Sequence, residues 1–513
     1  MYFAYFWRTA FNSVLATARL FAVVLLGLAL CAVAVAAYRL YIHPLASVPG
    51  PRWAAVSSVW HALHIRNGRV GQLAMTLHQK YGDAVRVGPN EVWFNSKEAF
   101  DQIYVATSLT KPRLDWCLRP HFQDTLDLLS ERDVKRYRLQ RRLIGRTYHA
   151  SNMAKFEAAL DSVLDGVMEK LGTFKGSEVD LTDWMHIVAV ECLGACVLSW
   201  SPGMLRDGTD WGTISHSYQG WRRKSVFGLF PLATKLDVWS SDFGRAFGKL
   251  WGVTYKTPVS FRAFFPEVTR RVSRRLKAAL RHSPIKDDRE DLLADLIQLH
   301  RDKPVFTETY LRKMAVTNFG AGHETMASTL TSVLAMIGSH AAVQTQVAAE
   351  IRGARGESDA SNLQYTRAVI KEAMRLYPVI AMSLPRKIPA GGLMIHQQWL
   401  PPNTTVGCNP VALHRNEDMY GADAAEFDPG RWLKAEAETL RAMDRYSLNW
   451  GGGSRSCPGR HLAELVVLKT VTRLLDRYDV KVEMPPESAQ RAYFLSMLTG
   501  VRVRFLPLQT SPQ

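Results

Sequence analysis

Residues 450–459 read WGGGSRSCPG, and they say more about the fold than any other part of the chain. Gly451 to Gly453 lack a Cβ atom, which lets the backbone approach something flat and closely packed. Cys457 precedes Pro458 and an apolar helical run, where amide N–H groups and a helix N-terminus favour the thiolate, the form that ligates metals. The alternative is a glycine-rich turn with an incidental cysteine. From average residue usage, this combination arises by chance in roughly one in 10⁴ chains of this length.

A second motif, GAGHET, occupies residues 320–325 inside a helical pattern that runs from about residue 308 to 339. Each mid-helix glycine costs about 1 kcal/mol relative to alanine. A local widening of the helix that admits a small molecule would justify that cost. Glu324 and Thr325 place an acid beside a hydroxyl, a pair that can relay protons. A buried glycine-rich helix contact explains the glycines equally well, and we expect His323 to be packed or capped.

The cysteine loop resembles the haem-binding loop of the cytochrome P-450 superfamily, F-x-x-G-x-R-x-C-x-G, with Trp450 in place of the usual phenylalanine. The resemblance implies haem b as cofactor, with Cys457 as the axial ligand of its iron. It also implies that Arg455 meets a haem propionate and that Trp450, Gly453 and Gly459 shape the cofactor loop. An indole N–H near the sulfur would shift the iron's potential without changing the reaction class.

Other motifs follow in the order that the family shows. The GAGHET segment matches the A/G-G-x-D/E-T oxygen-activation motif, which implies catalytic roles for Glu324 and Thr325. Glu372 and Arg375 lie three residues apart on one predicted helix face, so their charges can pair. They resemble the family's E-x-x-R pair, which joins an arginine matching Arg431 to brace the core on the haem side.

Two more arginines match propionate-binding positions of the family, Arg141 and Arg386. Tyr137 stands where the family usually has tryptophan or histidine, which puts a second contact there in doubt. The segments HPL at 43–45, PGP at 49–51 and YG to GPNEV at 81–92 are most similar to fungal microsomal members, including the pisatin demethylase-like group. The resemblance covers the chain from residue 43 to about residue 500.

The pattern of apolar residues indicates a mainly α fold with a minor β portion. We expect a β-hairpin at 81–94, small strands at 388–407 and 480–507, and helices from 95 to about 358. Residues 409–456 read as mostly irregular, with a short helical piece at 433–443. The resemblance implies a cytochrome P-450 fold preceded by an N-terminal transmembrane helix.

Residues 20–38 carry no charge and would span about 28 Å as a helix, enough for the hydrocarbon core of a bilayer. A signal peptide cleaved after an A-x-A site at 34–36 is the alternative, and the length of the apolar run favours an uncleaved anchor. We therefore divide the chain into a leader (1–19), an anchor (20–38), a stiff, non-helical, proline-rich hinge (39–51), a haem-thiolate monooxygenase domain (52–506) and a tail (507–513). The charges flanking the anchor do not set its orientation. The resemblance implies a single-pass protein of the endoplasmic reticulum whose catalytic domain faces the cytosol.

The 513 residues carry a net charge of +17. The densest basic run, at 270–281, has the spacing of a solvated helix face. No nucleic-acid-binding signature accompanies it, so nucleic acid is a poor candidate partner. Cys192 and Cys196 read as a small buried face rather than a metal pair, and six cysteines in this length make no disulfide framework. A second basic group would suit an acidic flavoprotein or serve only solubility; its members are Arg441, Arg445, Arg460 and Lys469.

The resemblance implies a monooxygenase that inserts one oxygen atom of O₂ into an apolar small molecule, by hydroxylation or epoxidation, in fungal secondary metabolism. Its electrons would come from NADPH through the membrane-bound cytochrome P-450 reductase, with cytochrome b5 as a second candidate donor. One alternative is a haem-thiolate isomerase or dehydratase without reductase, which an intact Glu324–Thr325 pair argues against. Another is a non-catalytic membrane haem or electron-transfer protein. The candidate substrate contacts, each more often core than ligand contact, are Trp116, Phe122, Ile380, Ala381, Met382 and Met497.

Overall fold

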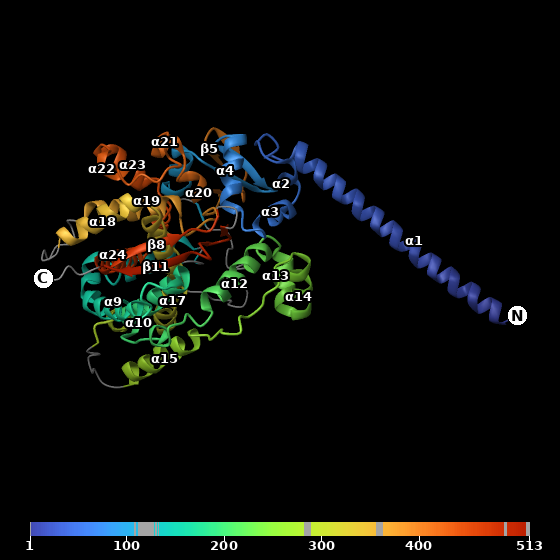
Figure 1. Ribbon diagram of the computed structural model, residues 1–513. Coiled ribbons are helices and arrows are strands. Elements are labelled where there is room, and N and C mark those ends of the chain that lie inside the picture. Colours follow the sequence, from blue (N-terminus) through green and yellow to red (C-terminus); the bar gives the residue numbers. More distant parts are fainter. Residues whose placement is uncertain are drawn as a thin grey trace.

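The computed structural model describes residues 2–106, 109–110, 128, 131, 133–281, 289–354, 363–486 and 490–508. Helices make up most of these residues, and the strands among them form four small sheets (Figure 1). This confirms the predicted mainly α fold with a minor β portion. A single long helix at the N-terminus extends away from the rest of the chain (Figure 1).

That long helix consists of α1 (Tyr2–Ala37) and a π-helical turn, η1 (Tyr38–Ile42). Residues Leu15–Ile42 are apolar enough to cross a membrane and are not buried against the body. At 1.5 Å per residue these 28 residues reach about 42 Å, more than a bilayer core needs. Helix α10 (Leu181–Leu198) is also long and apolar enough, but it is buried inside the protein and is therefore a core helix.

The segment after the anchor differs from the predicted non-helical hinge, because helical geometry continues through Ile42. It ends at His43, whose ψ of 141° is extended, because the residue before a proline is disfavoured in the α region. Arg39 Nη1 donates to the Val56 carbonyl at 2.5 Å. Arg86 Nη1 donates to the carbonyls of Arg39 at 2.8 Å and Leu45 at 3.2 Å. These bonds fasten the end of the helix to the body.

The centre of the body is α17 (Glu308–Ser339), which packs along α10. Thr307 starts α17 by accepting a hydrogen bond from the Tyr310 N–H at 3.3 Å. Almost every residue of α10 is buried, as expected of a helix that is apolar on all sides. Cys192 and Cys196 lie buried on α10, as predicted.

The other helical elements make up the rest of the body (Figure 1). In chain order they are α2 (Arg52–Val56), α3 (Ser58–Ile65), α4 (Val70–Tyr81), α5 (Lys97–Phe100), η2 (Asp101–Val105), α7 (Val134–Ile144), α8 (Ala150–Met153), η3 (Ala154–Phe156), α9 (Glu157–Gly172), α11 (Met204–Asp207), α12 (Thr213–Phe227), α13 (Pro231–Trp239), α14 (Ser241–Leu250), α15 (Phe265–Arg281), α16 (Leu292–Asp302), α18 (Ala341–Gly353), α19 (Gln364–Leu376), α20 (Pro410–Leu413), α21 (Glu417–Tyr420), α22 (Arg431–Lys434), α23 (Ala437–Arg445), η5 (Gly453–Arg455) and α24 (Arg460–Arg477). The single helical piece predicted at 433–443 is two helices, α22 and α23.

The predicted hairpin is present as antiparallel strands β1 and β2, which belong to a sheet of order β1-β2-β7-β4. A second sheet has the order β3-β11-β8, and two further pairs are β5-β6 and β9-β10. The strands are β1 (Ala84–Gly88), β2 (Glu91–Phe94), β3 (Glu178–Asp180), β4 (Arg386–Lys387), β5 (Leu393–Ile395), β6 (Gln398–Leu400), β7 (Thr405–Cys408), β8 (Tyr478–Glu483), β9 (Arg491–Ala492), β10 (Ser496–Met497) and β11 (Arg502–Pro507).

The basic run at 270–281 forms α15, and its residues have two different environments. Arg270 and Arg274 are exposed and pair with Glu267 on the same helix, as a solvated face predicts. Arg275 departs from that prediction, because its guanidinium pairs at 2.5 Å with Asp291, whose side chain is fully buried. This part of the run therefore joins α15 to the start of α16.

Candidate haem-thiolate site

Cys457 lies in a loop that closes on itself just before α24. The Cys457 N–H donates to the Trp450 carbonyl at 2.7 Å. A Cβ on Gly453 would collide with the Tyr104 carbonyl, and its φ of +58° also favours glycine. A Cβ on Gly452 would likewise press on the Tyr104 side chain. Two of the glycines are therefore needed because the loop packs closely on η2.

The Cys457 sulfur combines burial with free surface. Burial raises the pKa of the Cys457 thiol, while the N–H groups of Gly459 and Arg460 and the charge of Arg141 lower it. The amide N–H groups are where the sequence predicted them, but burial outweighs their effect, so they do not by themselves produce a thiolate. The side chain is nevertheless exposed. A cation bound to this exposed side chain would deprotonate the thiol.

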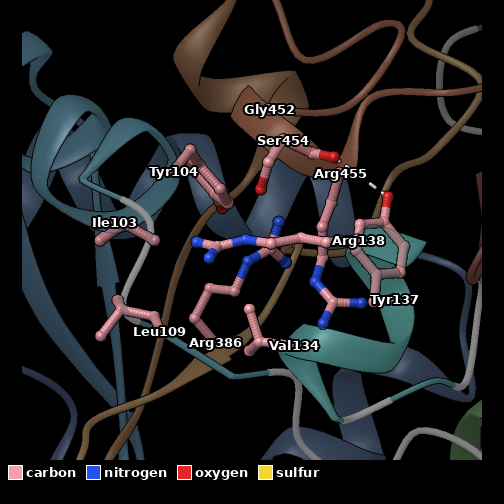
Figure 2. Close-up of a pocket in the computed structure, with 10 residues that line it drawn as sticks. All are labelled: Ile103, Tyr104, Leu109, Val134, Tyr137, Arg138, Arg386, Gly452, Ser454 and Arg455. Carbon is pink, nitrogen blue, oxygen red and sulfur yellow. Dashed lines mark hydrogen bonds between the residues drawn. The ribbon is translucent and has the colours of Figure 1, made fainter. Parts of the chain in front are cut away.

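Three arginines, Arg138, Arg386 and Arg455, line a pocket beside this loop (Figure 2). Arg455 Nη1 donates to the Glu131 carbonyl at 2.9 Å, and its Nη2 is buried without a hydrogen-bond partner. Arg386 Nη1 donates only to the adjacent Pro385 carbonyl at 3.1 Å among the bonds that the described residues form. Burial lowers the pKa of Arg386 and of Arg455, and the charge of Arg386 lowers that of Arg455 further. Three cations around one pocket favour an anionic ligand there.

Arg141 takes a different position from these three arginines. It does not line their pocket, and its Nη2 lies 3.5 Å from Ser456 Oγ, close to the cysteine. Tyr137 lies between the two regions: its ring stacks under the Arg455 guanidinium at 4.1 Å, and its hydroxyl donates to the Ser454 carbonyl at 3.1 Å (Figure 2). Burial raises the pKa of Tyr137. The charges of Arg141, Arg455 and Arg386 lower it, so all three are within electrostatic range of its hydroxyl.

The predicted structural trio comes together on α19. Arg375 Nη2 lies 2.7 Å from Glu372 Oε1, and both side chains are almost fully buried. Arg431 Nε lies 3.3 Å from the same oxygen. Arg375 also donates to the carbonyls of His414 and Ala424, each at 2.5 Å. The trio therefore fastens α19 to the irregular segment that leads to the cysteine loop.

The middle of α17 borders an open space. Gly320 and Ala321 are exposed although Phe319 and His323, next to them, are buried. The predicted widening is wrong, because α17 is a regular α-helix throughout. Gly322 has a packing role instead, since a Cβ there would press on Leu193 of α10. The open side therefore arises from small side chains and not from an irregular helix.

Thr325 and Tyr148 connect this stretch of α17 with its surroundings. Thr325 Oγ1 donates to the Ala321 carbonyl at 2.6 Å. Two residues before the motif, Asn318 Oδ1 accepts from the Tyr148 hydroxyl at 2.9 Å. Burial raises the pKa of Tyr148 and nearby Cys457 raises it further, so the sulfur lies close to this part of α17.

Glu324 and His323 point to different neighbours. The buried Glu324 carboxylate accepts from Trp221 Nε1 at 2.8 Å. Burial raises its pKa, while the hydrogen bond from Trp221 and the nearby Ser217 hydroxyl lower it. His323 Nδ1 lies 3.0 Å from His186 Nε2, and burial lowers the pKa of His323 to about 3. His323 is therefore packed, as predicted, while Glu324 keeps a proton more readily than an exposed acid does.

Comparisons with known proteins place this geometry in a family. The family model described as Cytochrome P450 matches residues 48–501. The chain belongs to the cytochrome P450 family. It is 52% identical over 93% of both chains to the Cytochrome P450 monooxygenase sdnT of Sordaria araneosa. It is 27% identical to the monooxygenase hepC of Aspergillus oryzae, over 89% of this chain and 91% of that one. A pisatin demethylase of Fusarium vanettenii is 26% identical over 87% of each.

This P450 is an oxidoreductase of the monooxygenase type, and its family implies haem-thiolate iron and electrons that come from a reductase. The residues present fit a haem. Cys457 offers a sulfur with free surface, and the buried Nη2 of Arg455 has no hydrogen-bond partner. The apolar helix Leu15–Ile42 fits a membrane anchor.

The predicted substrate contacts of this P450 divide into three groups. Trp116 and Phe122 lie outside the described residues. Ala381 and Met497 are buried at 0% and 1% exposure and have no surface to offer a ligand. Ile380 and Met382 keep some free surface. Ile380 also pairs with Leu495 through an isolated β-bridge, so two distant segments meet there.

Three residues at the site had no counterpart in the sequence analysis or were left in doubt there. Tyr104 donates its hydroxyl to the Leu384 carbonyl at 2.9 Å, and the Arg386 guanidinium lies 5.0 Å from its ring centre. Tyr137 supports Arg455, and Trp221 holds Glu324. Tyr104 and Trp221 are single aromatic residues outside any motif, so only their positions in space reveal them, whereas the sequence had already marked the position of Tyr137.

The second basic group is less basic than its sequence indicates. Arg445 pairs with Asp101 at 2.7 Å, and Arg460 pairs with Glu464 at 2.7 Å. Lys469 pairs with Asp161 at 3.0 Å. Intramolecular pairing neutralises three of the four cations and reduces the attraction that this face would exert on an acidic partner.

Proposed function

We propose that this P450 inserts one oxygen atom of O₂ into an apolar small molecule, by hydroxylation or epoxidation, in fungal secondary metabolism. The balanced reaction is R–H + O₂ + 2 e⁻ + 2 H⁺ → R–OH + H₂O. Similarity over nearly the whole chain to fungal monooxygenases supports the reaction class and the setting. The observation that carries the proposal is the exposed Cys457 on the same loop as Arg455, whose buried Nη2 has no hydrogen-bond partner.

Haem b bound through the Cys457 thiolate would supply oxygen activation, because electron donation from sulfur favours O–O cleavage. Trp450 and Gly453 hold the loop in the shape that presents this sulfur. Gly459 leaves its N–H free to point at the sulfur. The chain thereby orients the one ligand that it would give to the iron.

Arg455 and Arg386 would bind the haem propionates. Arg386 is buried and Arg455 is half-buried, and both line one pocket (Figure 2). A carboxylate accepts a charge-assisted hydrogen bond more strongly than a neutral acceptor does, so the propionates would replace the missing partners. Arg141 would act differently, since its charge favours the thiolate form of Cys457.

Thr325 and Glu324 would deliver the two protons. Thr325 Oγ1 is anchored to the Ala321 carbonyl at the open stretch of α17, where a hydroxyl can pass a proton to a molecule in that space. Burial raises the pKa of Glu324, so a larger fraction of its carboxyl group is protonated near neutral pH. The trio Glu372, Arg375 and Arg431 has a structural role, because its buried bonds join α19 to the segment 414–431.

NADPH would supply the electrons through a membrane-bound reductase, with cytochrome b5 as a second donor. We place the chain in the endoplasmic reticulum as a single-pass protein whose body faces the cytosol. The unburied apolar helix Leu15–Ile42 supports the membrane anchor. Exposed large apolar side chains on the first helices after the anchor, such as Trp53 at 74%, agree with a body that rests close to lipid.

The test is the carbon monoxide difference spectrum of the reduced full-length protein beside Cys457→Ala. A strongly red-shifted Soret band in the wild type that disappears in the variant is the expected result. Cys196→Ala, which removes a buried thiol from α10, is the matched control and should keep the band. A red-shifted band that survives Cys457→Ala, or a folded wild type without haem, would overturn the proposal.

A further inference from the structure

The carboxylate of Glu324 is held from outside its own helix. Ser217, Trp221 and Lys224 lie on one face of α12, at i, i+4 and i+7 spacing, and all three act on this carboxylate. Trp221 Nε1 donates at 2.8 Å, and the nearby Ser217 hydroxyl lowers the pKa of the carboxyl group. Lys224 contributes the attraction of its charge. The acid on α17 is therefore directed toward α12.

The Trp221 indole is in turn fixed by two other groups. Its ring stacks on Phe494 with centroids 4.7 Å apart and planes at 22°. The Lys224 ammonium lies 4.8 Å from the centre of the same ring. The Phe494 carbonyl accepts from the Ala381 N–H at 3.0 Å, so the stack reaches the segment that carries the proposed substrate contact Ile380. The Trp221 side chain therefore contacts both the Glu324 carboxylate and the Phe494 ring.

We propose that Trp221 is a positioning residue. Its indole N–H sets the orientation of the Glu324 carboxylate, and the stacking of its ring on Phe494 holds the indole in place. This inference rests on the proposed role of Glu324 as a proton donor. Without the Trp221 N–H, the Glu324 carboxylate loses the hydrogen bond that orients it, and it delivers protons to the oxygen less efficiently. Oxygen then leaves as peroxide, O₂ + 2 e⁻ + 2 H⁺ → H₂O₂, rather than as water, O₂ + 4 e⁻ + 4 H⁺ → 2 H₂O. In both cases NADPH supplies the electrons through the reductase.

The same bond has an electrostatic consequence. A donor to a carboxylate stabilises its charged form, and the hydrogen bond from Trp221 lowers the pKa of Glu324 against the effect of burial. Removing one such bond should raise the midpoint at which Glu324 ionises by about one pH unit. Ser217 and Lys224 remain in place and keep the carboxyl group titratable.

The variant that isolates the bond is Trp221→Phe, which keeps a ring for Phe494 and loses the N–H. The first measurement is the infrared carboxyl band of Glu324, identified by its loss in Glu324→Gln and titrated with pH in the full-length protein. We expect the midpoint to rise by about one pH unit in Trp221→Phe. Trp93→Phe is the matched control, because Trp93 Nε1 donates to Glu91 at the same 2.8 Å in the β1–β2 hairpin. An unchanged midpoint in Trp221→Phe overturns the inference.

The second measurement is the ratio of peroxide to water formed while NADPH is oxidised. The protein and its reductase are placed together in lipid vesicles, and no substrate is added. Trp221→Phe should raise the ratio of peroxide to water about tenfold, and Trp93→Phe should leave it unchanged. If Glu324→Gln leaves the ratio unchanged, the proposed role of Glu324 fails. If Glu324→Gln raises the ratio and Trp221→Phe does not, the role of Glu324 stands and the inference about Trp221 is wrong, even when the infrared midpoint has moved.

Discussion

Replacing Glu372 with glutamine should remove the buried charge on which two arginines converge. Glu372 Oε1 accepts from Arg375 Nη2 at 2.7 Å and from Arg431 Nε at 3.3 Å. Its Oε2 accepts from Arg375 Nε at 2.8 Å and from Trp432 Nε1 at 2.9 Å. The Glu372 and Arg375 side chains are 0% and 1% exposed, so water cannot solvate the Arg375 guanidinium once its counter-charge is lost. Breaking a buried pair in this way costs about 3–5 kcal/mol.

Urea unfolding followed by far-ultraviolet circular dichroism measures this loss. A chain of this length has a denaturant slope above about 3 kcal/mol per molar urea, so the midpoint should fall by about 1 M. The matched control is Glu267→Gln on α15, which removes a carboxylate from surface pairs with Arg270 and Arg274. That variant should lose less than about 1 kcal/mol. A Glu372→Gln midpoint no lower than that of Glu267→Gln would refute the reasoning.

Three further predictions concern other parts of the site. Thr325→Ala should let NADPH oxidation continue while product falls and peroxide rises; unchanged coupling would exclude the role assigned to Thr325. Gly453→Ala should lose haem several-fold, read as the ratio of Soret to protein absorbance, because a Cβ there meets the Tyr104 carbonyl at a φ of +58°; full haem content would show that the loop can move aside. Burial lowers the pKa of His414 from 6.5 to about 3, so the unfolded chain takes up the proton first. The stability that neutral His414 contributes is therefore complete above pH 6.5 and falls by about 1.4 kcal/mol per unit as the pH drops toward 3. His414→Gln should make the urea midpoint less dependent on pH between 3 and 6.5. An unchanged dependence would show that the pKa of His414 is not lowered by burial.

Local signals in the sequence predicted much of the fold. The apolar run at 20–38, the hairpin at 81–94 and the helix at 308–339 all depend on residues close together in the chain, and all three are present. The end of the first helix was harder to predict, because His43 before Pro44 stops it only after the π-helical turn. Local pattern thus predicts which segments are regular better than it predicts their ends.

The site was less accessible to sequence reasoning, because its contacts join distant segments. The E-x-x-R pair lies within one helix turn and was found from spacing. The bond from Trp221 to Glu324 joins residues 103 positions apart, and the bond from Tyr104 to Leu384 joins residues 280 positions apart. Periodicity indicates which face of a helix is buried but does not identify the partner on the other side. For the same reason the two glycines of the GAGHET motif looked alike in the sequence, although they have different neighbours in space.

The bonds that Arg39 and Arg86 make at the end of the N-terminal helix have a mechanical consequence. A helix that is fastened to the body transmits its own tilt, whereas a loose linker would absorb it. A span of about 42 Å exceeds a hydrocarbon layer of about 30 Å, and such helices lean over to match the layer. The tilt angle that matches the helix to the bilayer differs between thin and thick bilayers, so the catalytic body should rotate together with the helix. Membrane thickness would then set which side of the catalytic body faces the lipid.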